Sequence, residues 1–172
     1  MEIDINPPDI SHLFRLSAKY ANFFSERQLL ADVWCKWNEL IFSEYPRIFP
    51  GMFPTNELHE KCIKDCNLNS GIALNAAWSV GREFAEVYPA NAKYCLIINE
   101  YGSSLLPDIT RKELIDLADY TATLLIILMK HACKQGYLDK QTSIACLEIN
   151  RKMIREGILL AFKDGVASYY EQ

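Results

Sequence analysis

The sequence has few of the signals that specify β-structure. No stretch shows a sustained alternation of apolar and polar residues between turns. The one strand-like run is residues 94–98, and its neighbours Ala90, Ala92 and Lys93 favour a helix. Seven glycines and seven prolines in 172 residues are slightly fewer than usual, which argues against long disordered linkers. The sequence therefore predicts an all-α protein.

Catalytic signatures are also missing. The chain contains no phosphate-binding glycine-rich loop, no HExxH and no GxSxG. It also lacks Glu-x-x-His, the pair that helical di-iron sites require. We therefore assign no catalytic residue, expect no cofactor and favour a protein that is not an enzyme.

No segment is apolar enough to enter a membrane, and no section carries a strong basic excess. The longest apolar stretch, Thr121 to Met129, is less than half of the ~20 residues that a membrane helix needs. The net charge is −4, and acids and bases are mixed along the chain. The start of the chain, residues 1–8, is acidic and proline-broken, unlike a signal peptide. We expect a flexible or extended tail there, a cytoplasmic protein, no membrane insertion and no nucleic-acid partner.

Six cysteines are present, at positions 35, 62, 66, 95, 133 and 146. Without an export signal, they are expected to be reduced and to pack as small apolar residues. His59, Cys62 and Cys66 share one helical face and form the one weak candidate for a metal site. Zinc would need a fourth ligand, so no metal is expected.

What the sequence does contain is a series of helical patterns between recognisable ends. A chain of this length most simply forms one domain, here residues 1–172. The expected helices span about 9–24, 26–44, 55–66, 69–88, 90–102, 110–135 and 139–163. Because the first two could be one bent helix, we predict a single compact bundle of six to seven helices.

The helix at about 110–135 is predicted to be the buried centre of that bundle. Thr110 and Glu113 have the spacing of a capping box, so the helix should begin there. From Ala118 to Ala132 the apolar residues surround the helix. A helix without a polar face is covered by other helices.

A row of small residues recurs every four positions at Ala73, Ala77, Gly81 and Ala85. Such a ridge lets the backbone of a neighbouring helix approach closely. The alternative is a ligand slot in the space where side chains are missing. The residues of that alternative pocket are Ala77, Gly81, Arg82, Asp116, Asp119 and Tyr120.

A stripe of charged residues marks the last predicted helix. Glu148 and Lys152 are four residues apart, as are Lys152 and Glu156. Pairs at this spacing contribute ~0.2–0.5 kcal/mol each and indicate a face in contact with water.

The most unusual segment is residues 45–54, in which three prolines and a glycine interrupt an apolar loop. Loops usually face water and are usually polar. Either this loop covers the end of its own bundle, or a partner covers it. Aromatic residues, Met and Arg are enriched at the centres of interfaces. The candidate partner-binding residues are Arg47, Ile48, Phe49, Met52 and Phe53.

The primary hypothesis is therefore a non-catalytic interaction protein: an adaptor, a chaperone-like carrier or an inhibitor of a partner protein. Its partner would be another protein or a second copy of the chain. The alternative is a small-molecule-binding or enzymatic helical bundle, with its pocket near Ala77 and Gly81.

Overall fold

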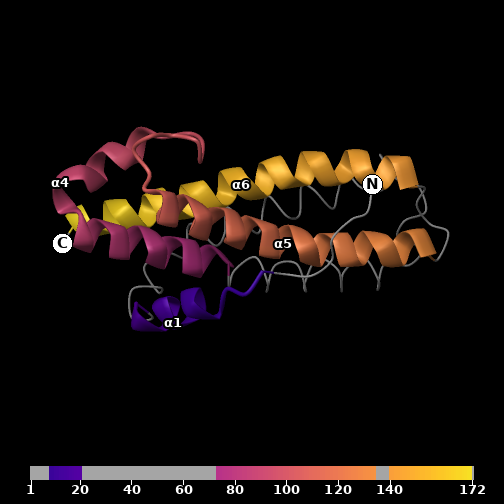
Figure 1. Ribbon diagram of the computed structural model, residues 1–172, viewed down its shortest axis with the longest axis horizontal. Helices are drawn as coiled ribbons and strands as arrows, with labels where there is room; N and C mark the ends of the chain where they lie inside the picture. The colour runs from indigo at the N-terminus through magenta and orange to yellow at the C-terminus, as the bar shows by residue number, and fades with distance from the viewer. Residues whose placement is uncertain (1–7, 21–72, 135–139, 172) are drawn as a thin grey trace.

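A computed structural model describes residues 8–20, 73–134 and 140–171 (Figure 1). Most of these residues are helical and none is in a strand, which confirms the all-α prediction for the described part of the chain. None of the helices in these ranges combines the length and the apolar character needed to cross a membrane. Residues 1–7 of the tail expected at 1–8 lie outside the described residues, as do the loop at 45–54 and the segment holding His59, Cys62 and Cys66.

The helical elements follow one another with short connections in the C-terminal half. They are α1 (Ser11–Lys19), a helical segment at 73–87, α4 (Pro89–Ala92), the 3-10 helix η2 (Lys93–Ile97), α5 (Asp108–Lys134) and α6 (Lys140–Tyr170). The predicted count of six to seven helices includes residues 21–72, which are not described.

The helices α5 and α6 form the long axis of the molecule and run side by side in opposite directions (Figure 1). The 73–87 segment packs along the C-terminal half of α6, and α1 lies on the outer side of that segment (Figure 1). α6 extends seven residues beyond its predicted end, passing through Asp164 and Gly165 without a break. Packing explains the difference, because Gly165 lies directly against the 73–87 segment.

The proline at position 89 ends the 73–87 segment, as expected. Tyr88 is non-helical, and Pro89 occupies the first turn of α4, where its missing N–H costs nothing. The helix predicted for 90–102 is shorter than expected, because η2 ends at Ile97 and turns follow. The strand-like run at 94–98 is mostly 3-10 helix, with Cys95 buried in the core as a free thiol.

α5 begins at Asp108, immediately after Pro107, rather than at the expected capping box. Thr110 is buried inside the first turn, so it is not the cap. Three consecutive residues, Thr121 to Thr123, are buried. Because successive residues on a helix point about 100° apart, this part of α5 is covered on more than one side.

The core forms where the 73–87 segment, α5 and α6 meet. Its largest fully buried side chains include Trp78, Phe162 and Leu114, and Leu13 reaches it from α1. The rings of Phe84 and Phe162 lie with their centroids 6.0 Å apart. Burying an aliphatic or aromatic side chain contributes roughly 1.5–3 kcal/mol, so this cluster is the main source of stability for the described helices.

Candidate functional site

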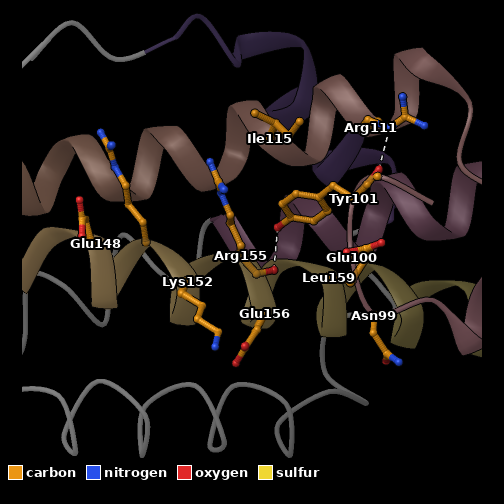
Figure 2. Close-up of a pocket in the computed structure, with 12 residues that line it drawn as sticks. Asn99, Glu100, Tyr101, Arg111, Ile115, Glu148, Lys152, Arg155, Glu156 and Leu159 are labelled. Carbon is orange, nitrogen blue, oxygen red and sulfur yellow. Dashed lines mark hydrogen bonds between the residues drawn. The ribbon is translucent and has the colours of Figure 1, made fainter.

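A cleft of about 720 Å³ lies between α5, α6 and the loop at 99–102 (Figure 2). This volume falls within the range of roughly 300–1,000 Å³ that is usual for small-molecule sites. The lining residues are Asn99, Glu100, Tyr101, Gly102, Arg111, Ile115, Glu148, Arg151, Lys152, Arg155, Glu156 and Leu159. The cleft therefore combines seven charged side chains with an apolar floor.

Tyr101 joins the loop to both long helices. Its hydroxyl donates a hydrogen bond of 2.6 Å to the backbone carbonyl of Arg155 on α6. Its own carbonyl accepts a hydrogen bond of 2.6 Å from Nε of Arg111 on α5 (Figure 2). Burial raises the pKa of the phenol strongly, the charge of Asp119 raises it further, and Arg155 partly opposes both. Tyr101 therefore stays protonated and acts as a donor at neutral pH.

Arg111 holds the loop in place with most of its donors. Besides the Tyr101 carbonyl, Nη2 reaches the carbonyls of Ser103 at 3.1 Å and Leu106 at 3.3 Å. Nη1 lies 3.1 Å from Oδ1 of Asp108. With these partners, Arg111 shapes the cleft wall and has little capacity left to bind a ligand.

Arg151 and Arg155 are four residues apart on α6, so both lie on the side of that helix that borders the cleft. Within the described residues, no carboxylate lies within 4 Å of either guanidinium. Both still act on Asp119 of α5: burial raises the pKa of that carboxyl, while Arg155 and then Arg151 lower it. The two arginines are thus close enough to α5 to lower the pKa of Asp119, although neither forms an ion pair with another described residue.

The rest of the charged stripe differs from expectation. Neither the Glu148–Lys152 pair nor the Lys152–Glu156 pair forms a salt bridge in the described structure. Figure 2 shows the side chains of Lys152 and Glu156 extending away from α5, whereas that of Arg155 extends toward it, past the Tyr101 ring. All of these residues are exposed, as a water-facing stripe requires.

The apolar part of the cleft is small and better buried. Leu159 is 5% exposed, and Ile115 and Tyr101 are half-buried. These side chains are the apolar part of the cleft lining, which we call the floor. A site with this construction suits a ligand that has both an apolar body and a charged group.

A second polar cluster joins α1 to the 73–87 segment. The hydroxyl of Tyr20 lies 2.5 Å from Oε2 of Glu83 and 2.7 Å from Oε2 of Glu86. Nζ of Lys19 is 2.7 Å from the same Glu83 oxygen. The hydrogen bonds from Lys19 and Tyr20 lower the pKa of Glu83. Because Tyr20 is only 3% exposed, this cluster ties α1 to the core.

The structure places the six residues of the predicted alternative pocket apart from this cleft. Ala77 and Gly81 are buried, and Gly81 lies against the α6 backbone at Phe162 and Val166. The Arg82 guanidinium is buried too, with Nε 3.4 Å from Glu86 and its centre 5.3 Å from the Tyr169 ring. None of these three residues lines the cleft.

The remaining predicted residues lie on α5. Asp116 pairs with Nζ of Lys112 at 2.7 Å, which is an ordinary surface pair on one helix. Asp119 and Tyr120 are half-buried, and neither lines the cleft. Within the described ranges, no group of three or more His, Cys, Asp or Glu side chains is placed to hold a metal ion.

Comparison with known proteins adds no identification: no protein-family model, no curated protein and no solved structure matches the chain.

Sequence reasoning did not single out Tyr101, Arg111 or Arg155 as site residues. The i, i+4 spacing of Arg151 and Arg155 is visible in the sequence, but this spacing alone is equally typical of a solvated charged face. Nothing in the local sequence indicated that the loop at 99–102 would fold back between α5 and α6. The cleft is a product of that tertiary contact.

Proposed function

We propose that the protein is a non-catalytic interaction protein that acts in the cytoplasm as an adaptor, a carrier or an inhibitor of a partner protein. The supporting observation is the concentration of exposed apolar side chains in one part of the chain. Of the eight large apolar residues that are exposed in the described ranges, six lie between 87 and 109: Val87, Tyr88, Tyr94, Ile97, Leu105 and Ile109. We call these six residues the apolar stretch.

Two members of the apolar stretch are unusually open to water. Ile97 is 74% exposed and Ile109 is 69% exposed. Single exposed apolar residues need no explanation, but a concentration of them is a feature of interaction surfaces. Covering both isoleucines with a partner would remove most of their apolar area from water. Each Å² of apolar area that is buried contributes roughly 25 cal/mol of favourable free energy.

The sequence alone did not indicate the apolar stretch as a contact region. The loop at 45–54, with Arg47, Phe49 and Phe53, remains a second proposed contact outside the described residues. The proposal also treats the chain as a single domain of six to seven helices, with α5 as the predicted central helix.

The test is quantitative affinity capture of the wild-type chain and of two double variants. Ile97→Asp with Ile109→Asp should lose the specifically captured protein, or the self-association, that the wild type shows. Phe49→Asp with Phe53→Asp tests the loop in the same way. Glu171→Gln, at an exposed position beyond the end of α6 and outside the cleft lining, is the control for altered surface charge.

Both aspartate variants must keep the wild-type melting temperature for the comparison to count. Unchanged capture by a folded Ile97→Asp/Ile109→Asp variant would contradict a role for the apolar stretch. Unfolding of the Phe49→Asp/Phe53→Asp variant would instead show that the loop is part of the core.

A further inference from the structure

The cleft between α5, α6 and the loop at 99–102 carries an inference separate from partner binding through the apolar stretch. Three features bear on it: the pair of arginines that form no ion pair within the described residues, the apolar floor and the position of the acids around the rim. Each of them restricts the chemistry of a ligand.

The first feature is the pair Arg151 and Arg155. Like charges four residues apart on a helix repel each other, and among the described residues no carboxylate lies within 4 Å of either guanidinium. A guanidinium group presents a planar fork of donors that matches the oxygens of a carboxylate or phosphate. An anionic group placed at this pair would satisfy both forks and remove the repulsion.

The second feature is the floor formed by Ile115, Leu159 and the ring of Tyr101. Leu159 is buried and the other two are half-buried, so much of the floor is already shielded from water. An inorganic anion alone would leave this surface uncovered. A ligand with an aliphatic or aromatic body would cover it and gain the hydrophobic contribution.

The third feature is the set of rim acids: Glu100, Glu148 and Glu156. Together with the four cationic side chains of the lining, these three acids give the cleft a small net positive charge. They would repel a ligand that carries negative charge along its whole length. This favours a single anionic head over a polyanion such as a nucleic acid.

We propose that this cleft binds a small amphiphilic anion, whose carboxylate or phosphate head pairs with Arg151 and Arg155 and whose apolar body lies over Ile115 and Leu159. Tyr101 and Arg111 are positioning residues, because they hold the loop that closes one side of the cleft. The ligand chemistry is shared by soluble metabolites and by lipid headgroups.

The experiment is isothermal titration of the full chain with four probes below their micelle-forming concentrations: decanoate, decyl phosphate, decanol and inorganic phosphate. Decanoate and decyl phosphate should bind. Decanol and inorganic phosphate should bind at least tenfold more weakly, because each lacks one half of the recognised chemistry.

Arginine variants test where the anionic head of the ligand binds. Charge-assisted hydrogen bonds contribute about 1.5–3 kcal/mol, so Arg151→Gln with Arg155→Gln should weaken decanoate binding by at least tenfold. The matched control is Arg15→Gln, which removes one cation from the exposed face of α1 and should change nothing. Arg151→Lys with Arg155→Lys keeps the positive charge but loses the planar pair of donors on each side chain. This variant should bind decanoate with intermediate affinity.

Three results would overturn the proposal. The first two are failure of both amphiphilic anions to bind, and equal binding of decanoate by the wild type and the folded glutamine variant. Decanol binding as tightly as decanoate would also overturn it. Co-sedimentation with phosphatidylcholine vesicles, with and without phosphatidic acid, separates the two ligand sources. Arginine-dependent sedimentation would assign a lipid headgroup, and its absence with decyl phosphate bound would assign a soluble ligand.

Discussion

Gly81 and Gly165 have reciprocal roles, because each glycine leaves room for the backbone of the helix that carries the other. A Cβ atom on Gly81 would overlap the carbonyl oxygen of Phe162, and a Cβ atom on Gly165 would overlap that of Trp78. The contact explains why the small-residue row and a glycine in the middle of α6 occur in the same chain. At these two glycines, the backbones of the 73–87 segment and of α6 lie directly against each other.

Replacing either glycine should therefore destabilise the protein. Gly81→Ala and Gly165→Ala each force two backbones apart, and overpacking typically costs about 1–3 kcal/mol, more than the ~1 kcal/mol that alanine gains in helix propensity. Urea unfolding monitored by circular dichroism measures the change. Gly102→Ala is the control, because nothing lies within 4 Å of a Cβ at that position. Equal stability of all three variants would contradict the close contact.

The Tyr20 hydroxyl should be a major anchor for α1. Tyr20→Phe removes a donor shared by Glu83 and Glu86 in a nearly buried position. Hydrogen bonds to charged groups contribute about 1.5–3 kcal/mol, and the free energy of unfolding should fall by this amount. Tyr170→Phe, which removes an exposed hydrogen bond of 2.7 Å to the Pro89 carbonyl, should cost clearly less. The opposite order would contradict the anchoring role.

Stability should change with pH in two opposite steps. Burial raises the pKa of Glu113 above its usual 4.5, so the folded state binds this proton more tightly and stability rises as pH falls through that pKa. Hydrogen bonds from Lys19 and Tyr20 hold the pKa of Glu83 below 4.5. The stability from Glu83 is complete above pH 4.5 and is lost as pH falls through its lowered pKa.

Unfolding free energies measured from about pH 8 to about pH 3 should separate these two steps. Glu113→Gln should remove part of the rise on mild acidification, and Asp119, whose pKa burial also raises, should supply a further part. Glu83→Gln should flatten the decline at lower pH. If neither variant changes the shape of the profile, these carboxyls are not the groups responsible.

Arg111 should control the order of the cleft loop. Arg111→Ala removes three contacts to the carbonyls of Tyr101, Ser103 and Leu106. Hydrogen exchange of the amides at 103 and 106 should accelerate by tenfold or more, while α6 amides keep their protection. Lys112→Ala, which removes only a surface pair with Asp116, should leave exchange in the loop unchanged.

Several features of the fold were readable from sequence because they depend on local chemistry. The proline at 89 predicted the end of the 73–87 segment, and the row containing Ala77 and Gly81 indicated a close approach of two helices. Boundaries were less accurate where packing outweighs local preference. The cap pattern at Thr110 is overridden by a start at Asp108, and α6 continues through Asp164 and Gly165.

The cleft shows the same difference between features set by local sequence and features set by packing. The sequence by itself determined that the described chain is helical, where proline interrupts it and that Arg151 and Arg155 share a helix face, because these follow from backbone geometry and residue spacing. Only the tertiary structure decided that Gly81 lies against the backbone at Phe162. It also decided that Tyr101 joins Arg111 of α5 to the Arg155 carbonyl of α6. Tyr101 and Arg155 are 54 positions apart, and Gly81 and Phe162 are 81 positions apart. Contacts over such separations depend on how whole helices pack, and no local pattern specifies them.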